Sequence, residues 1–433
     1  MAIHVVQAGD TLLSIAQTYG VPAERIVRDN QLANPNGLVV GQALLILTPL
    51  ETYQVVPGDT LFAVSQRSGI SINQLYQYNP GLIEQNMLFP GQTLILSYDQ
   101  PKMGRFAVNG YAYPFIDKGL LRQAIPYLTY LTPFSYGLNP DGTLVNLDDG
   151  ELIATARYFG VAPLMHLSTL TPEGIFNNDL AHIVLTDPAV QSRTIQAVLE
   201  NIQRKDYYGL DVDFEFVYAA DALAYAQFIS NLREVLEPYG YPVMTALAPK
   251  TSATQRGLFY EGHNYAAIGE ASDAVLLMTY EWGYTYGPPM AVAPINKVEE
   301  VVRYGVSEIP TDKLFLGIPN YGYDWTLPFV RGESRAQSIS NVTAINLAST
   351  HGAAIQFDAT AATPYFNYTG MDGRQHQVWF EDVRSISAKF NLASSYNLVG
   401  LGYWNLMRPF LQNWLLLGVS YDVVRLLSPQ YLY

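Results

Sequence analysis

The chain has 433 residues, of which 49% are hydrophobic and only 14% charged, and its formal net charge is −14. This composition excludes a disordered chain and fits roughly two to four domains, or small modules beside one large barrel. The acidic balance argues against nucleic acid as a partner, because counterion release needs basic side chains. Without cysteine the chain has no disulfides, and its six histidines show no ligand spacing, so we expect no metal and no cofactor.

Residues 1–9 show no basic flank followed by an apolar run, so no signal peptide is visible. No stretch is apolar and long enough to span a membrane. We therefore expect a protein that is kept inside a cell, exported by an unusual route, or deposited on a structure assembled within a cell. We also expect a monomer.

The first hundred residues contain an internal repeat. Gly9–Leu12 matches Gly58–Leu61, and Asn30 matches Asn79 at the same offset. This pattern resembles the LysM module, which binds glycans containing N-acetylglucosamine; the alternative is a generic small βααβ spacer. The two predicted modules are residues 1–48 and 52–97.

Each copy predicts the order strand, helix, helix, strand. Asp10 and Asp59 stand just before helical patterns, so they are the expected N-caps. The predicted strands are His4–Gln7, Leu44–Leu47, Tyr53–Val56 and Leu94–Leu96. We expect Pro49–Glu51 to link the modules and Ser97–Gly104 to join the second module to the rest. Because this second linker is short, both modules should lie close to the following domain.

From Arg105 onward, short apolar strands alternate with amphipathic helices. The predicted strands are Phe106–Tyr111, Tyr127–Phe134, Ala162–Leu167, Gly209–Phe216, Val243–Leu247, Ala274–Tyr280, Leu314–Ile318 and Leu398–Trp404. The predicted helices include Ala189–Lys205, with Asp187 as N-cap and Pro188 at the first helical position, and Asp221–Glu237. About eight strand–helix units predict an α/β fold, a (β/α)₈ TIM barrel over residues 104–433, with a doubly wound sheet as the alternative.

Residues 326–377 break this alternation between the seventh and eighth strands. They are rich in Gly, Ser, Thr and Asn and contain β-like pieces at Ala354–Phe357 and Pro364–Tyr368. We interpret them as a small α+β insertion that stands over the barrel mouth.

The most informative segment is the fourth predicted strand of the barrel. Because side chains alternate along a strand, Asp211, Asp213 and Glu215 share one face, which we expect to point into the barrel. Val212, Phe214 and Phe216 share the other face, which suits packing against the outer helices.

Carboxylates gathered inside a barrel destabilise the fold unless protons or hydrogen bonds relieve their charge. Neighbouring negative charges raise the pKa of at least one member, which leaves a neutral acid beside an ionised carboxylate, as glycosidic cleavage requires. Glu215 comes last in the segment, nearest the strand end where barrel active sites form. A solvated edge strand and a metal site built from the same acids are the alternatives.

The segment Gly209–Glu215 resembles the Asp-Gly-x-Asp-x-Asp-x-Glu pattern of glycoside hydrolase family 18, although Tyr208 stands where the pattern begins with Asp. Met278–Tyr280 resembles the family's Met-x-Tyr-Asp, with Glu281 in place of the Asp. The resemblance covers residues 105–425. It implies that Trp404 floors the sugar site. The further substrate-binding residues expected are Met278, Tyr111 and Tyr321.

The same resemblance implies a retaining mechanism in which the substrate's own acetamido oxygen attacks the anomeric carbon. Glu215 would protonate the glycosidic oxygen and later activate water. Asp213 would hold the acetamido N–H, and Tyr280 would bond the acetamido oxygen. Asp211 would share a proton with Asp213.

Two LysM-like modules joined to such a barrel resemble the spore cortex-lytic N-acetylglucosaminidases of bacilli. We therefore expect a peptidoglycan hydrolase associated with the spore coat or cortex, or with the cell wall, whose modules bind the glycan. The alternatives are a chitinase with the same site and a non-catalytic glycan-binding protein. The presence of Glu215 argues against the last alternative.

Overall fold

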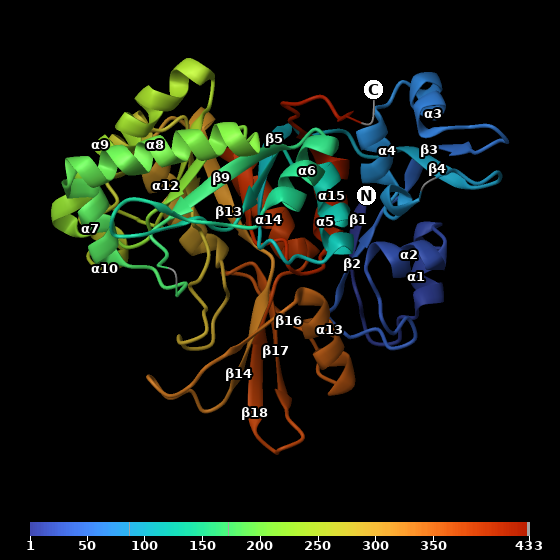
Figure 1. Cartoon of the computed structure of the whole chain (residues 1–433). Helices are drawn as coiled ribbons and strands as arrows, with labels where there is room; N and C mark the ends of the chain where they lie inside the picture. Colours follow the sequence, from blue (N-terminus) through green and yellow to red (C-terminus); the bar gives the residue numbers. More distant parts are fainter. Residues whose placement is uncertain (86, 172, 431–433) are drawn as a thin grey trace.

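The computed structural model describes residues 1–85, 87–171 and 173–430. Residues 431–433, which the predicted barrel domain includes, lie outside this range. The predicted barrel is confirmed: eight parallel strands follow in the order β5, β6, β9, β10, β11, β12, β13 and β19, and β19 pairs back with β5 (Figure 1). Their bounds are β5 Arg105–Ala112, β6 Tyr130–Pro133, β9 Ala162–Ser168, β10 Gly209–Asp213, β11 Val243–Leu247, β12 Ala274–Leu277, β13 Leu314–Pro319 and β19 Gly400–Trp404.

Helices cover the outside of this barrel and bury their apolar faces against the strands. The longest helix, α8, begins as predicted, with Pro188 at its first position and the Asp187 carboxylate accepting from the backbone N–H groups of Ala189 and Val190. The outer helices are α5 Lys118–Ala124, α6 Gly150–Tyr158, α7 Asn178–Thr186, α8 Pro188–Lys205, α9 Ala222–Leu236, α10 Leu258–Glu261, α11 Tyr265–Ala271, α12 Ile295–Glu308, α14 Val383–Ser395 and α15 Leu411–Ser420. The two short strands β7 Gly137–Leu138 and β8 Leu144–Val145 pair with each other as a hairpin. The strand β20 Asp422–Val423 pairs with β5.

Several barrel strands are shorter than the sequence predicts. A 3₁₀ turn over Ile125–Tyr127 replaces the start of the second predicted strand. β10 ends at Asp213 and β12 at Leu277, so Glu215 and Tyr280 lie in the segments that follow the strands. Apolar and alternating residues continue past both ends, which is why the pattern alone placed these strand ends too late.

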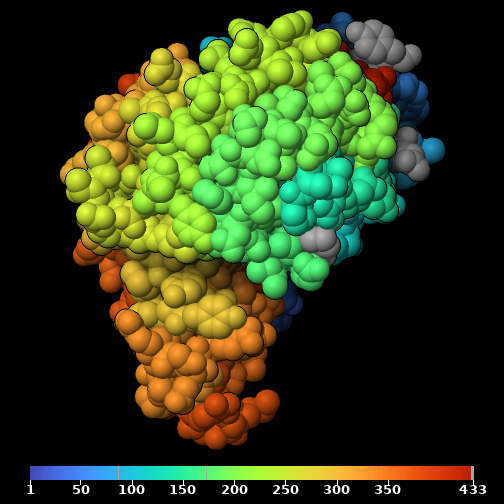
Figure 2. All heavy atoms as spheres, turned by 60° about the vertical axis from the view of Figure 1, so that its left-hand side comes forward, coloured from blue at the N-terminus to red at the C-terminus, as the bar shows by residue number. Residues whose placement is uncertain are grey.

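Between β13 and β19 stands a separate five-stranded antiparallel sheet in the order β15, β14, β18, β17 and β16. It includes β14 Gly322–Thr326, β15 Gln337–Ile339, α13 Asn341–Thr350, β16 Gln356–Asp358, β17 Thr363–Thr369 and β18 Gln375–Trp379. Its own core contains Phe366, Val378 and Phe380. The sheet projects from one end of the barrel, as the orange elements show (Figures 1 and 2).

The two N-terminal modules have the predicted order of elements. Module 1 consists of β1 Ala2–Val5, α1 Leu12–Tyr19, α2 Ala23–Asp29 and β2 Ala43–Ile46. Module 2 consists of β3 Pro49–Gln54, α3 Leu61–Ser68, α4 Ile72–Tyr78, the 3₁₀ turn Leu82–Glu84 and β4 Thr93–Tyr98. The repeated asparagines tie each module together: the Asn30 side chain bonds Ile26 and Leu45, and that of Asn79 bonds Leu75 and Ile95.

Two predictions about the modules are wrong. The N-caps are Thr11 and Thr60, whose hydroxyls accept from the third backbone N–H of each helix. Asp10 instead accepts from the backbone N–H of Gln7 at 2.7 Å, and Asp59 from that of Val56 at 2.9 Å, so both aspartates close the preceding turn.

The predicted linker Pro49–Glu51 is also not a linker. These residues begin β3, and Pro49 pairs with Tyr98 across the module 2 sheet. The chain therefore passes from module 1 into module 2 without a flexible connection.

Both modules dock on the barrel. Gln412 of α15 donates to Asn30 Oδ1 at 2.7 Å and to the Ala43 carbonyl at 2.9 Å in module 1. Gln77 of module 2 donates to the Pro126 carbonyl at 2.8 Å, and its own carbonyl accepts from the Tyr127 hydroxyl. Apolar side chains of both modules, such as Leu45 and Tyr98, belong to the same buried cluster as the barrel helices.

Module 1 additionally contacts the inserted sheet. The backbone N–H of Ile355 donates to the Val40 carbonyl at 2.9 Å, and Arg384 donates to the Gly41 carbonyl at 3.2 Å. A Cβ atom on Gly41 would lie 1.8 Å from the Ile355 carbonyl oxygen. Module 1 therefore joins the barrel and the insertion, and Gly41 allows the close approach.

Candidate active site

A cavity of about 530 Å³ opens at the carboxyl ends of the barrel strands. This is the end where (β/α)₈ barrels place their reacting groups. Its lining combines two acidic side chains of the β10 segment with aromatic rings from several other segments. The lining residues are Asp213, Glu215, Phe216, Pro249, Phe259, Tyr260, Met278, Tyr280, Glu281, Trp282, Tyr284 and Trp404.

The three predicted carboxylates form a gradient of burial along β10. Asp211 is fully buried in the barrel, where its Oδ2 accepts from the Tyr111 hydroxyl at 2.6 Å. Asp213, 5% exposed, reaches the cavity wall, and Glu215 is half-buried beyond the strand end. Asp213 and Glu215 therefore face the cavity, whereas Asp211 supports them from beneath.

Burial raises the pKa of Asp211 to about 6, although the nearby His166 and the Tyr111 hydrogen bond act in the opposite direction. The pKa of Glu215 lies well above its usual range, first because of burial and then because of the negative charges of Asp213 and Glu281. Glu215 is therefore suited to carry a proton at neutral pH and to donate it to a leaving group.

The predicted substrate-binding residues fall into two groups. Trp404 and Met278 line the cavity, as does Tyr280, which was predicted as a catalytic residue. Tyr111 and Tyr321 do not line it; Tyr111 bonds Asp211, and the Tyr321 hydroxyl donates to Glu281, which also accepts from Tyr323 at 3.1 Å. Tyr111 and Tyr321 thus orient acidic side chains from behind.

Aromatic rings pack around Trp404, which lines the cavity. The ring of Trp404 lies 4.9 Å from that of Phe134 and 5.8 Å from that of Tyr111. Tyr113 packs on Phe134 at 5.2 Å and stacks on Phe115, which is 76% exposed. Packed rings therefore run from Trp404 at the cavity to the exposed Phe115.

Comparison with known sequences shows the family of the chain. The family described as glycosyl hydrolases family 18 matches residues 179–408, and the LysM domain matches residues 4–46 and 53–97. The chain belongs to family 18 of the glycosyl hydrolases. It is therefore a glycosidase with two N-terminal LysM domains.

This family 18 enzyme resembles several relatives over its whole length. It is 40% identical to the cortical fragment-lytic enzyme of Bacillus subtilis (strain 168), over 98% of this chain and 99% of the relative. The crystal structure of the Bacillus cereus spore cortex-lytic enzyme SleL matches with a TM-score of 0.83 and 37% identity, covering 98% of each chain. That of the Bacillus megaterium QM B1551 enzyme matches with the same TM-score and 36% identity, over 98% of this chain and 99% of the other.

The two departures of this family 18 enzyme from the motif have different structural settings. Tyr208 precedes β10 and packs against Tyr130, with ring centroids 6.2 Å apart, so it lies outside the cavity. Glu281 lines the cavity, at a left-handed backbone φ of +66°, and two tyrosine hydroxyls hold its carboxylate. The longer Glu side chain is therefore anchored at the cavity wall.

One sequence prediction about the cavity is wrong, and several lining residues were not predicted. Phe216 was expected to pack outward, but it lines the cavity, because β10 ends at Asp213 and the strand alternation ends with it. Phe259 and Tyr260 come from α10, and Trp282 and Tyr284 come from the loop after β12. The only available signal for them was the high content of 32 Tyr and 18 Phe, which does not single out any position.

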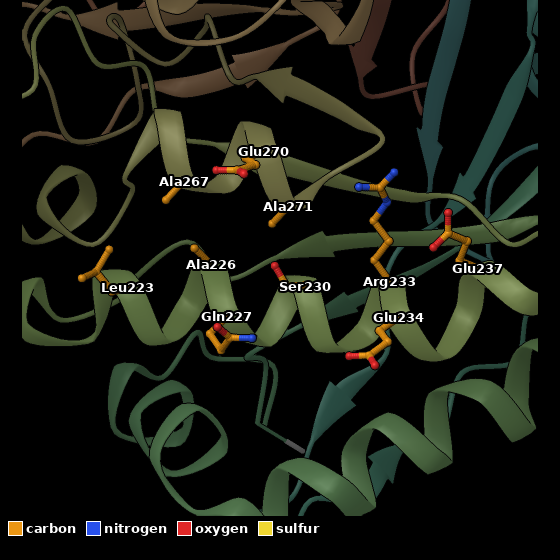
Figure 3. Close-up of a pocket in the computed structure, with 10 residues that line it drawn as sticks. All are labelled: Leu223, Ala226, Gln227, Ser230, Arg233, Glu234, Glu237, Ala267, Glu270 and Ala271. Carbon is orange, nitrogen blue, oxygen red and sulfur yellow. The ribbon is translucent and has the colours of Figure 1, made fainter.

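A second hollow of about 540 Å³ lies outside the barrel between α9 and α11 (Figure 3). Arg233 in this groove forms an ion pair with Asp273 at 2.9 Å, whereas Glu234, Glu237 and Glu270 are exposed. The acids of this groove face solvent, so it lacks the buried, proton-bearing carboxyl group that marks the cavity at the strand ends. Among the described residues, no helix is long and apolar enough to cross a membrane.

Proposed function

We propose that this family 18 enzyme hydrolyses N-acetylglucosaminyl bonds in the peptidoglycan of the spore cortex. The observation that carries the proposal is the pairing of Glu215, whose pKa is raised, with Asp213 in an aromatic cavity. Full-length similarity to cortical fragment-lytic enzymes supports the choice of substrate. The site of action would be the cortex or cell wall.

In the proposed reaction Glu215 donates its proton to the glycosidic oxygen, and the 2-acetamido oxygen of the substrate attacks the anomeric carbon. Asp213 accepts a hydrogen bond from the acetamido N–H and balances the positive charge of the oxazolinium ion. Tyr280 donates to the acetamido oxygen. Glu215 then removes a proton from water. The water oxygen attacks the anomeric carbon and opens the oxazolinium ring, so that the configuration is retained.

Asp211 has a supporting role in this scheme. It is fully buried and held by the Tyr111 hydroxyl, and its pKa is raised to about 6, so it accepts a proton more readily than an ordinary aspartate. Trp404, at the cavity floor, would stack on the sugar that is cleaved. The LysM domains, docked on the barrel, would hold the same polymer.

The test is parallel digestion of purified cortical fragments, intact cortex, vegetative cell wall and chitin, with mass spectrometry of the products. We expect cortical fragments to be cut most rapidly and to give products with N-acetylglucosamine at the reducing end. Rapid release of chitooligosaccharides, with cortical fragments left intact, would identify a chitinase. No release from any substrate would contradict the catalytic proposal.

A further inference from the structure

His166 of β9 lies directly beside the catalytic strand. In the parallel pairing of β9 with β10, His166 is the partner of Asp211 and Ser168 is the partner of Asp213. Partner residues in parallel strands point to the same face, so the imidazole shares the barrel interior with the carboxylates. Its ring is fully buried between those of Tyr111, at 5.6 Å, and Phe134, at 4.7 Å.

The two nitrogens of this imidazole have different surroundings. Nδ1 lies 2.7 Å from the hydroxyl oxygen of Ser135, which lies 2.7 Å from that of Ser168. Nε2 has no hydrogen-bond partner among the described residues, and its nearest charged atom is Oδ2 of Asp213 at 3.6 Å. A buried polar nitrogen without a partner is rare and marks a place where a partner is exchanged.

Proton positions around His166 follow from its neighbours. Ser135 and Ser168 can each donate to the Tyr136 carbonyl, 3.1 Å and 3.3 Å away; when Ser168 does so, the Ser135 hydroxyl is free to donate to Nδ1. The imidazole then carries its proton on Nε2, facing Asp213. The opposite tautomer would set a lone pair of Nε2 against the carboxylate, which is electrostatically unfavourable.

We propose that His166 is a positioning residue for Asp213: its Nε2–H, 3.6 Å from the Asp213 carboxylate, attracts that carboxylate electrostatically until the substrate's acetamido N–H binds it. This inference rests on the proposed mechanism, in which Asp213 binds the acetamido group. The exchange replaces this electrostatic contact with a hydrogen bond from the substrate, and no covalent bond changes. It keeps the negative charge of Asp213 compensated in both states, although the site is buried.

The titratable groups that face His166 determine how its contact with Asp213 affects the pH dependence of turnover. They are Tyr111 from β5 and Asp211 and Asp213 from β10, while the segment after β6 contributes Phe134 and Ser135, which do not titrate in this range. Since His166 lowers the pKa of Asp211, its removal should raise that pKa further. The acidic limb of the pH–rate profile should then move to higher pH.

Three variants of the full chain test the proposal on cortical fragments. His166→Met keeps the volume without a donor, and we expect kcat to fall about 10- to 100-fold, because the Asp213 carboxylate loses the N–H that faces it. His166→Gln keeps an N–H near the position of Nε2 and should restore most of this loss. Ser135→Ala frees Nδ1 and should shift the acidic limb in the same direction by less.

The melting temperature of each variant separates positioning from packing. Two results would overturn the proposal and leave His166 as only a packing residue. One is an equal kcat for His166→Met and His166→Gln. The other is a lower melting temperature in both variants with no shift of the acidic limb in either. Should His166→Met fail to fold, the comparison of His166→Gln and Ser135→Ala with the wild type decides. An inactive wild-type enzyme would instead contradict the proposed function.

Discussion

The barrel mouth and the interface between the modules and the barrel both bury polar side chains, but their hydrogen bonding differs. At the interface, Gln412 and Gln77 donate to fixed acceptors on the other side. At the mouth, Asp211 Oδ1, Asp213 Oδ1 and His166 Nε2 lack partners among the residues that the structure describes. Unpaired buried groups reduce stability, and we infer that a substrate supplies a partner for Asp213, which lines the cavity.

This difference separates two kinds of substitution. Changes at the mouth should reduce activity and leave stability unchanged or higher, because they remove unfavourable buried charge. Changes at the interface should reduce stability and leave turnover of short soluble fragments unchanged, because no residue of the modules lines the cavity.

The largest effect is expected for Glu215→Gln. The amide has the same shape but cannot donate the required proton, so kcat on cortical fragments should fall by at least about 10²- to 10⁴-fold. The melting temperature should equal or exceed that of the wild type. Steady-state kinetics and a thermal melt measure both quantities, and Glu237→Gln, at an exposed acid outside the barrel, is the matched control. Activity within threefold of the wild type would refute the role of Glu215.

Asp211→Asn should stabilise the protein at neutral pH. The folded-state pKa of about 6 exceeds the ordinary value of 3.8, so between these values the folded protein keeps a proton that the unfolded chain has lost. The free energy of unfolding of the wild type therefore falls as pH rises through this window, by up to about 3 kcal/mol. The neutral amide avoids this loss.

Denaturant unfolding of wild type and Asp211→Asn at several pH values provides the measurement. The variant should be more stable above pH 6, and the difference should disappear below pH 3.8. Its activity should fall, since Asp211 can no longer exchange a proton with Asp213. A stability difference that does not change with pH would contradict the assigned pKa.

Gln412→Ala tests the interface. It removes the donor to Asn30 and Ala43 and leaves buried acceptors without a partner, which should destabilise the protein by about 1–3 kcal/mol. Turnover of soluble fragments should stay at the wild-type level. Gln227→Ala, which removes only the exposed bond to Asn231, is the control. A loss of turnover in Gln412→Ala would show that the modules influence the mouth.

Exhaustive chelation should have the smallest effect. The proposed chemistry moves protons between carboxyl groups and the substrate, so turnover after dialysis against a chelator should equal that before dialysis. Activity that returns only on addition of a divalent ion would favour the alternative that the acidic segment binds a metal.

Much of the fold followed from periodicity. The alternation of Asp211 and Asp213 with apolar residues located the catalytic strand, and the repeated Gly-Asp-Thr-Leu segments located the modules. The same alternation failed at Phe216, because a strand period holds only while the strand lasts. The cap positions failed because Asp10 and Thr11 are both good caps, and only the preceding turn decides between them.

The residues that pack against and position the catalytic side chains could not be derived from the sequence. A single histidine at position 166 carries no spacing signal, and its meaning comes from the pairing of β9 with β10. Likewise, the contacts of Tyr321 with Glu281 and of Trp404 with Phe134 join residues far apart in the chain. Such neighbours depend on barrel closure, which composition and local pattern do not specify.

Gly41 and Gly91 occupy equivalent turns of the two modules, each with a φ of +86°, yet only Gly41 has a neighbour at the missing side chain. The left-handed turn alone therefore explains Gly91, whereas Gly41 also sets the distance between module 1 and the inserted sheet. Module 1 connects the barrel to the inserted sheet, and the sheet cannot move away from module 1 without breaking the Ile355–Val40 hydrogen bond. The orientation of the inserted sheet on the barrel is thus tied to module 1, and a force applied to module 1 would pass directly to the insertion.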